Sequence, residues 1–282
     1  MTTIQWFPGH MAKARRLIKG SLKQVDLVIE LLDARAPKSS ANPLLRELAV
    51  SKPTLTLLNK DDLADPVATK LWADWYERGG MRLPLRISAG TGKGISAIVA
   101  ACKELLGSLR LISRSPIRAL LFGIPNSGKS TLINTLTGRR KTVTGARPGL
   151  TRGLRRVTIS KELEIYDSPG LLWHKLEKAG LILASIGAIK ETTLPDEEVV
   201  GEFLYYMSRI YPAILMRNYN LSSLSNTPHG LFGQVGMSRG CIGVGARIDV
   251  RRTAQMVFKE LRDGNFGRMS LEWPDGRGWR SG

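Results

Sequence analysis

The sequence predicts an α/β fold: a mostly parallel β-sheet with helices on both faces, followed by a small C-terminal helical domain. Apolar runs of strand length alternate with helical stretches in the first part of the chain, which is typical of a parallel sheet covered on both sides. A glycine-rich loop joins one such run to a helix at residues 123–130. From about residue 178 only helical patterns remain, so we place a domain boundary near residue 175, between domains 1–175 and 176–282.

The expected strands are short, largely apolar segments. They cover residues 25–33, 54–58, 85–87, 117–122, 155–160 and 163–166. Helices of the first domain are expected at residues 11–24, 67–78, 94–106 and 128–137, and the first of these is amphipathic and basic. Helices of the second domain are expected at residues 179–190, 195–211 and 250–262. Asp249 can cap the last helix and Gly264 can end it, whereas the glycine-rich span 230–245 predicts a loop.

The composition fits a globular protein, but its charge is strongly unbalanced. With 42 Lys and Arg against 24 Asp and Glu, the formal net charge is +18. This excess favours a polyanionic partner, with nucleic acid the first candidate and an anionic membrane surface the second. No apolar run approaches the roughly 18 residues of a membrane span, and no lipidation motif is visible at either end. Two isolated cysteines and three scattered histidines give no metal signature and indicate a reducing, intracellular location.

The loop at residues 123–130 has the spacing G-x-x-x-x-G-K-S of a phosphate-binding P-loop. Its glycines let successive backbone N–H groups point at one anion, and the following helix N-terminus adds its dipole. In this pattern Lys129 reaches the β- and γ-phosphates and Ser130 ligates Mg²⁺. The alternative is an ordinary glycine-rich turn, but the strand before it and the helix after it favour a phosphate site. The expected nucleotide contacts here are Asn126, Ser127, Gly128, Lys129, Ser130 and Thr131.

The segment Asn59-Lys60-x-Asp62 follows a predicted strand and indicates guanine as the base. The Asp62 carboxylate can accept hydrogen bonds from N1–H and the 2-amino group of guanine, with Asn59 at the other edge of the base and Lys60 along its face. Adenine would leave this carboxylate unpaired, so ATP binding conflicts with Asp62. A polar turn is the simpler interpretation of these residues alone. Ser88-Ala89 after the next strand strengthens the guanine hypothesis, because Ser-Ala there resembles the backbone contact to guanine O6 in GTPases.

A further group of residues predicts a magnesium site. Asp167 ends a predicted strand within the sequence D-S-P-G, and such an aspartate can hold Mg²⁺ through water. The N–H of Gly170 can meet the γ-phosphate, and Thr151 is a plausible second ligand of Mg²⁺ in the loop after the P-loop helix. D-x-P-G alone would more often be a β-turn, so its significance comes from its place after the P-loop.

The order of these motifs is unusual. Ordinary GTPases begin with the phosphate loop, whereas here the base-recognition segments 59–62 and 88–89 precede it, so the chain looks like a P-loop GTPase fold with a circularly permuted motif order. Further motifs are W-F-P-G-H-M, D-A-R, P-G-x-T and A-S-I-G, at residues 6–11, 33–35, 148–151 and 184–187. The full set resembles the bacterial ribosome biogenesis GTPase A family over nearly the whole chain.

The resemblance implies a cytoplasmic enzyme that hydrolyses GTP to GDP and phosphate in late assembly of the large (50S) ribosomal subunit. Such a factor binds the pre-subunit with GTP and leaves after hydrolysis, with stimulation by the large subunit and by K⁺. A nucleotide-gated RNA-binding scaffold with incidental hydrolysis is the alternative. The expected partner is 23S-type rRNA, without DNA specificity or membrane contact, and the expected state is a monomer.

Individual roles follow from the same resemblance. Leu171 stands where many GTPases place a glutamine that orients the attacking water, and leucine cannot do this. The family implies that His10 supplies catalysis instead; a structural role at a helix start is the alternative. Asn126 matches the asparagine that helps to hold K⁺ in potassium-activated relatives, or it stabilises the loop. Candidate rRNA contacts, each more often a solvated charge when taken alone, are Lys13, Arg15, Arg16, Arg139, Arg140, Lys141, Arg152, Arg251 and Arg252.

Overall fold

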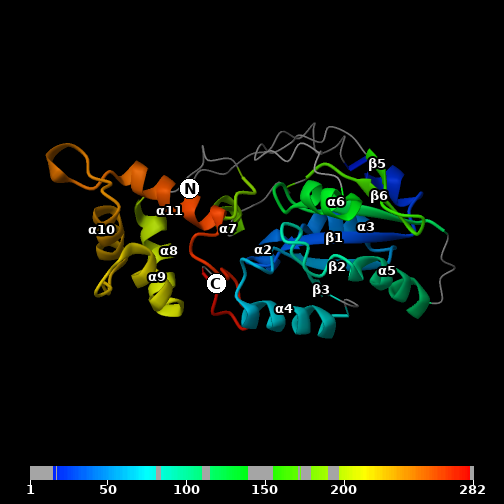
Figure 1. Cartoon of the computed structure of the whole chain (residues 1–282), viewed down its shortest axis with the longest axis horizontal. Coiled ribbons are helices and arrows are strands. Elements are labelled where there is room, and N and C mark those ends of the chain that lie inside the picture. Colours follow the sequence, from blue (N-terminus) through cyan, green and yellow to red (C-terminus); the bar gives the residue numbers. More distant parts are fainter. Residues whose placement is uncertain are drawn as a thin grey trace.

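The computed structural model describes residues 15–16, 18–80, 84–109, 115–138, 155–170, 172, 179–189 and 197–279. Within these ranges the chain forms a sheet with its helices at one end and a group of helices at the other (Figure 1). None of the helices in these ranges is long and apolar enough to cross a membrane.

Among the described residues, a six-stranded sheet forms the centre of the larger part. Its strands are β1 (Leu27–Asp33), β2 (Thr54–Asn59), β3 (Leu85–Arg86), β4 (Ile117–Phe122), β5 (Arg155–Thr158) and β6 (Leu163–Asp167). Their order is β3-β2-β1-β4-β6-β5, and every pair is parallel except β5 with β6. All of β1 is buried, as a central strand covered on both faces requires. The predicted mostly parallel sheet is confirmed.

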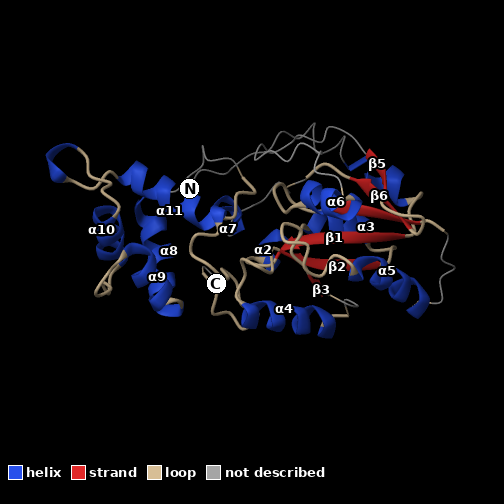
Figure 2. Cartoon of the chain, in the orientation of Figure 1, coloured by secondary structure: helices blue, strands red, loops and turns tan. Residues whose placement is uncertain are grey.

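Helices surround the sheet (Figure 2), and side chains of β1 alternate between two groups of them. Leu27, Ile29 and Leu31 pack with α5 (Ala97–Ser108) and α6 (Lys129–Thr137). Val28 packs with α3 (Pro43–Ala49), and Leu32 packs with α4 (Pro66–Arg78). Because strand side chains alternate with a period of two, one apolar strand can bury both of its sides, and helices cover both faces as predicted.

Most predicted boundaries agree with the structure to within a few residues, and the exceptions have local causes. α5 begins later than predicted because Gly92 and Gly94, with φ of 84° and 74°, form a turn before it. α7 (Ala179–Ser185) ends before residue 190, and Gly187 follows it with φ of 80°. Of the predicted helix 11–24, the described residues 15–16 and 18–22 are helical. Among the described residues, the prediction omits four helices that begin with proline, α2 (Pro37–Ser40), α3, α9 (Pro212–Tyr219) and α10 (Pro228–Ser238).

The helical part packs around an apolar core, to which α8 (Glu197–Ile210), α10 (Pro228–Ser238) and α11 (Val250–Asp263) contribute. Ala36, Ala68 and Ile124 of the sheet part belong to the same core. The rings of Phe203 in α8 and Phe258 in α11 lie 5.9 Å apart at this core. Asp249 caps α11, since its carboxylate accepts a hydrogen bond from the N–H of Arg252 at 2.9 Å, and Gly264 ends the helix with φ of 78°. Both predicted ends of α11 are confirmed.

The prediction of a loop over residues 230–245 is wrong for its first half, which belongs to α10. The helix starts at Thr227, whose hydroxyl accepts a hydrogen bond from the N–H of Gly230 at 3.1 Å. Its apolar face is buried through Leu231, Phe232 and Val235. Glycine has a low intrinsic helix propensity, which misled the prediction, but burial of this face outweighs that cost. Beyond α10, residues 244–246 form a short 3-10 helix.

After α11 the chain returns to the sheet, as the red segment that runs beside α4 in Figure 1. We call residues 265–279 the C-terminal tail. The N–H of Leu271 donates to the carbonyl of Arg35 at 2.7 Å, and the indole N–H of Trp72 in α4 donates to the carbonyl of Glu272 at 3.0 Å. Glu272 also accepts hydrogen bonds from the N–H groups of Lys38 (2.7 Å) and Ser39 (3.0 Å) in α2. The tail therefore fastens the end of the helical part to the sheet part.

Candidate functional site

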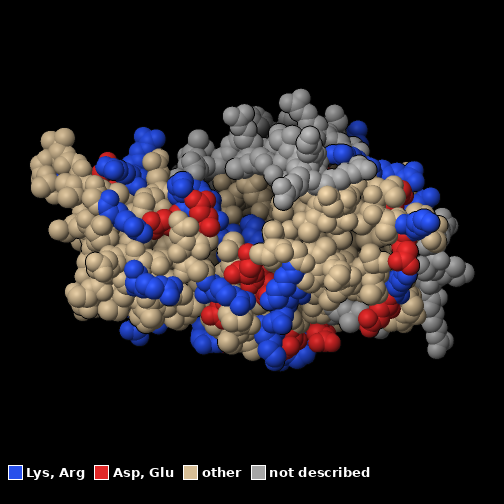
Figure 3. Space-filling model, in the orientation of Figure 1, with Lys and Arg blue, Asp and Glu red and all other residues tan. Residues whose placement is uncertain are grey.

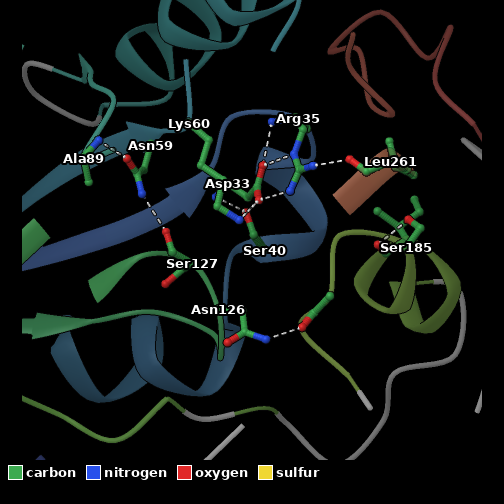
Figure 4. A network of polar contacts seen from close by, with 12 residues as sticks. Asp33, Arg35, Ser40, Asn59, Lys60, Ala89, Asn126, Ser127, Ser185 and Leu261 are labelled. Atoms are coloured by element: carbon green, nitrogen blue, oxygen red, sulfur yellow. Dashed lines mark hydrogen bonds and ion pairs between the residues drawn. The ribbon is translucent and has the colours of Figure 1, made fainter. Parts of the chain in front are cut away.

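The carboxyl ends of β1, β2, β4 and β6 lie along one edge of the sheet. The chain runs outward from β1 through β2 to β3, then crosses back so that β4 lies on the other side of β1. In open α/β sheets, ligands bind outside the strand ends at such a switch point. Asp33, Asn59 and Asp167 end β1, β2 and β6 at this edge, and the phosphate loop (residues 123–130) follows β4. Figure 4 shows Asp33, Asn59 and residues of the phosphate loop at this edge.

Two glycines of the phosphate loop occupy positions where a side chain would collide. A Cβ atom at Gly123 would lie 2.6 Å from the carbonyl oxygen of Leu31, and one at Gly128 would overlap the side-chain amide of Asn59. Gly128 also has φ of 101°, a conformation that glycine adopts without strain. α6 begins directly after it, and no side chain of the described residues caps its first turn. The N–H groups of that turn are therefore available to an anion.

Lys129 is buried at the start of α6. Its ammonium donates hydrogen bonds to the carbonyl oxygens of Gly123 (2.9 Å) and Ile124 (2.8 Å). Burial lowers the pKa of this ammonium to about 8, and the negative charge of Asp167 opposes that effect. A phosphate in the loop would supply a second negative charge, which favours the charged lysine.

Asp167 presents a carboxylate oxygen that lacks a partner. Its Oδ1 is buried and makes no hydrogen bond with the described residues, and burial raises the pKa of this carboxyl above its ordinary value. A bound cation would satisfy this oxygen. Mg²⁺ commonly takes one or two carboxylates together with phosphate oxygens and water, so Asp167 with Ser130 fits this ion. Consistently, no group of three His, Cys, Asp or Glu side chains in the described ranges could hold a metal alone.

Gly170 lies against the phosphate loop. A Cβ atom there would be 3.0 Å from the ammonium nitrogen of Lys129 and 3.0 Å from the backbone nitrogen of Pro125. Any larger residue would press on the lysine that is expected to contact the γ-phosphate. The backbone N–H of Gly170 therefore lies in the same part of the site as Lys129 and the phosphate loop.

Asn59 joins three of the predicted motifs. Its side-chain N–H donates to the carbonyl of Ser127 at 2.7 Å, and its amide oxygen accepts a hydrogen bond from the N–H of Ala89 at 2.9 Å (Figure 4). Segments 59–62 and 88–89 are thus held beside the phosphate loop. The amide of Asn59 organises these loops, and its direct contact with a base stays a prediction. The carboxylate of Asp62 makes no hydrogen bond with the described residues and can accept donors from a ligand.

Asp33, Arg35 and Lys60 form a buried ion group behind these loops. The motifs at residues 33–35 and 59–62 contain these residues but do not predict that they pair. The guanidinium of Arg35 donates two parallel hydrogen bonds to Asp33, at 3.0 and 2.9 Å, and Nζ of Lys60 lies 2.8 Å from the same carboxylate. Burial alone would raise the pKa of Asp33, but Arg35 and Lys60 hold it well below its ordinary value. Arg35 also donates to the carbonyl of Leu261 in α11 at 3.0 Å. In the sequence, the sign of this group is a pair of opposite charges, Asp33 and Arg35, at the end of an apolar strand.

Asn126 links the phosphate loop to the helical part. It has φ of 58°, and its side-chain N–H donates to the carbonyl of Gly187 at 2.6 Å (Figure 4). The motif at residues 184–187 therefore touches the phosphate loop. The amide oxygen of Asn126 has no hydrogen-bond partner among the described residues and can face a cation.

The remaining predicted residues fall into two groups. His10, Lys13, Arg139, Arg140, Lys141, Thr151, Arg152 and Leu171 lie outside the described residues. Arg15 and Arg16 are exposed before β1, whereas Arg251 and Arg252 are exposed in α11, in the other half of the molecule. On the face seen in Figure 3, basic side chains are interspersed with acidic ones and form no continuous patch over the described residues.

The site combines a phosphate loop, an aspartate that can bind a cation, and base-recognition loops. The base-recognition loops precede the phosphate loop in the chain, which is typical of the circularly permuted P-loop GTPases. A family model described as "50S ribosome-binding GTPase" matches residues 118–195. Ribosome biogenesis GTPase A of Bacillus cereus is 43% identical, over 96% of this chain and 94% of its own. The structure titled "Crystal structure of GNP-bound YlqF from T. maritima" has a TM-score of 0.62 and 28% identity, over 93% of this chain and 99% of that one. The chain belongs to the ribosome biogenesis GTPase A family.

Family membership confirms the resemblance and the permuted P-loop GTPase fold. It also establishes the protein as a GTPase that acts as a ribosome assembly factor. A GTPase binds GTP and GDP, and Mg²⁺ is the ion that usually accompanies them.

Proposed function

We propose that this GTPase serves assembly of the large (50S) ribosomal subunit, binding the pre-subunit in its GTP state and leaving after hydrolysis. One observation carries the proposal: the phosphate loop and the base-recognition loops meet at one edge of the sheet. At the same edge, Asn126 and Arg35 form hydrogen bonds with the helical part. The matched family model names 50S ribosome binding. Mitochondrial ribosome-associated GTPase 1 of mouse, also named for the ribosome, is 34% identical over 82% of this chain and 69% of its own.

In the proposed nucleotide complex, each loop has one task. Asp62 accepts hydrogen bonds from guanine, with Lys60 along the base and the Ser88-Ala89 backbone at O6. Residues 126–131 surround the phosphates, where Lys129 contacts the β- and γ-phosphates and the N–H of Gly170 meets the γ-phosphate. Ser130, Asp167 and Thr151 hold Mg²⁺, which supplies positive charge at the phosphate oxygens. The buried, unpaired oxygen of Asp167 supports its part in this assignment.

For hydrolysis we assign the water-orienting role to His10. A neutral imidazole can accept a hydrogen bond from water and direct the water oxygen at the γ-phosphorus, whereas Leu171 cannot. The bond between the γ-phosphorus and the bridging oxygen breaks, and GDP and phosphate are the products. K⁺ beside the phosphates would be held by the amide oxygen of Asn126, whose N–H side is already bound to Gly187.

The remaining proposals concern the whole chain. We assign residues 1–175 to the GTPase domain and 176–282 to a helical domain that contacts rRNA, in a cytoplasmic monomer. Contact between Gly170 and the γ-phosphate would bias the position of the helical domain, because Gly170 is close in sequence to the start of that domain. A pre-subunit affinity that is equal with a GTP analogue and with GDP would contradict this coupling.

Hydrolysis measured with and without large ribosomal subunits tests the proposed function. We expect strong stimulation by the subunit in K⁺, a loss of about 100-fold or more of the stimulated rate in His10→Ala, and a lower rate when Na⁺ replaces K⁺. Nucleotide affinity should be unchanged in His10→Ala. Absence of stimulation, with nucleotide-dependent subunit binding retained, would instead support the scaffold alternative.

A further inference from the structure

The base loop (residues 60–65), which carries Asp62, is covered by the C-terminal tail. The N–H of Met269 donates to the carbonyl of Leu63 at 3.0 Å, and the N–H of Asp65 donates to the hydroxyl of Ser270 at 3.2 Å. Met269 and Ser270 are both fully buried by this contact and its surroundings. At the end of α11, a Cβ atom on Gly264 would lie 2.7 Å from Leu63, so the two surfaces fit without space between them.

Arg268 adds a side-chain contact at the turn of the base loop. One nitrogen of its guanidinium donates to the carbonyl of Asp61 at 2.8 Å, and another donates to the carbonyl of Ala64 at 3.0 Å. One planar group therefore joins the two carbonyls that flank Asp62 and Leu63. Because the donors of a guanidinium have a fixed geometry, this contact sets the distance between those carbonyls.

The opposite side of the base loop is held by the sheet part. Lys60 is paired with the buried Asp33, and the N–H of Asp61 donates to the carbonyl of Ile87 at 3.0 Å. The carboxylate of Asp61 lies 2.9 Å from the ammonium of Lys93. The backbone on both sides of Asp62 is therefore held in place, by the sheet part at Lys60 and Asp61 and by the C-terminal tail at Leu63 and Ala64.

We propose that Arg268 is a positioning residue for guanine recognition, so that the C-terminal tail completes the base site. The inference rests on the proposed contact between Asp62 and the base. A carboxylate that accepts N1–H and the 2-amino group together must be placed accurately for both bonds. Displacement of the base loop therefore costs more affinity for guanine than for hypoxanthine, which lacks the 2-amino group and offers Asp62 one donor.

Binding of GDP and of IDP to the full chain tests this inference. We expect Arg268→Ala to weaken GDP binding about tenfold and to weaken IDP binding less, so that the preference for GDP over IDP falls about threefold or more. Arg268→Lys keeps the charge but loses the fixed fork, and it should give an intermediate ratio. The matched control is Arg277→Ala in the same tail, where the guanidinium pairs with Asp275 on the surface and touches no part of the base loop. It should leave both affinities unchanged.

A change in the GDP-to-IDP ratio separates positioning from general destabilisation. Loss of folding in Arg268→Ala would lower both affinities equally, and Arg268→Lys then decides the question. Equal weakening of GDP and IDP in a folded Arg268→Lys variant, or no change in either, would overturn the inference.

Asp62→Asn distinguishes this inference from the proposed site on which it rests. The asparagine amide can donate to the 2-carbonyl of xanthine, so the variant should bind XDP better than GDP. If Asp62→Asn leaves the base preference unaltered, the base site itself is assigned wrongly. If Asp62→Asn alters the preference and Arg268→Ala does not, the base site stands and the role of Arg268 is refuted.

Discussion

Lys129 is a buried ammonium whose hydrogen bonds end on two backbone carbonyls, Gly123 and Ile124. Asp167 is a buried carboxyl with an oxygen that has no partner among the described residues. Burial acts on the two groups in opposite directions, lowering the pKa of Lys129 and raising the pKa of Asp167. A nucleotide phosphate with its cation favours the charged form of both side chains, because it places a negative charge at the lysine and a positive charge at the aspartate.

The lowered pKa of Lys129 predicts a pH dependence of GDP affinity. In the free protein the ammonium loses its proton as pH rises through about 8. Phosphate binding favours the charged form and so takes up a proton above that pH. We therefore expect GDP to bind about tenfold more weakly at pH 9 than at pH 7, measured by titration calorimetry.

Lys129→Arg is the control for this pH dependence, since arginine stays charged throughout the range. Its GDP affinity should change little between these two pH values, whatever its absolute value. A decline of the same size in Lys129→Arg would assign the pH dependence to another group, such as the base. A flat profile in the natural protein would contradict the role of Lys129.

At the scale of elements, α10 shows how packing decides a helix that is poor in intrinsic propensity. Its glycines have different surroundings: a Cβ atom at Gly233 would meet nothing within 4 Å, whereas one at Gly236 would lie 2.8 Å from Cγ2 of Ile248. Gly236 therefore allows the close approach of the chain around Ile248, and Gly233 has no such role.

This contrast predicts opposite effects of two matched substitutions. Gly233→Ala should raise the free energy of unfolding by about 0.5–1 kcal/mol, because alanine loses less backbone entropy in a helix. Gly236→Ala should lower it by about 1 kcal/mol, because the added methyl forces Ile248 to shift. Urea unfolding measures both. Equal effects of the two substitutions would show that residues 228–238 do not pack as α10 does here.

At the scale of the whole molecule, the helical part is attached to the nucleotide edge at several points. Asn126 bonds to Gly187 after α7, Arg35 bonds to Leu261 in α11, and the C-terminal tail lies on the base loop. Occupancy of the phosphate or base positions can therefore bias the helical part directly. The proposed coupling between the bound nucleotide and the helical part would run through these contacts.

The net charge of +18 predicts a strong salt dependence of binding to the large subunit. Release of counterions from RNA phosphates makes affinity fall as salt rises, so we expect a loss of about tenfold or more between 50 and 200 mM salt. Neutralising Arg251 and Arg252 together should reduce the slope. Lys259→Ala in the same helix should not, because Asp263 already pairs with that lysine at 2.8 Å. An affinity independent of salt would contradict an rRNA contact.

Local pattern was sufficient for much of the fold and of the site. Apolar runs predicted the buried strands β1, β2, β4 and β6, because burial of both faces demands such runs. The spacing of Gly123, Gly128 and Lys129 predicted the phosphate loop, since that backbone shape depends on adjacent residues. Asp249 and Gly264 predicted the ends of α11, because capping is a local interaction. The order of the motifs along the chain indicated the permuted GTPase class, and Asn59 with Asp62 indicated the guanine base.

Tertiary structure alone decided the contacts between distant segments. Arg35 and Leu261 are 226 positions apart and Arg268 and Asp61 are 207 apart, so no periodicity or short motif could pair them. α10 depends likewise on what covers Leu231 and Phe232, not on the propensity of its glycines. The sequence by itself therefore determined the fold class and the chemistry of the nucleotide site. Only packing in three dimensions decided how the helical part is joined to that site, because these bonds form after distant segments come together.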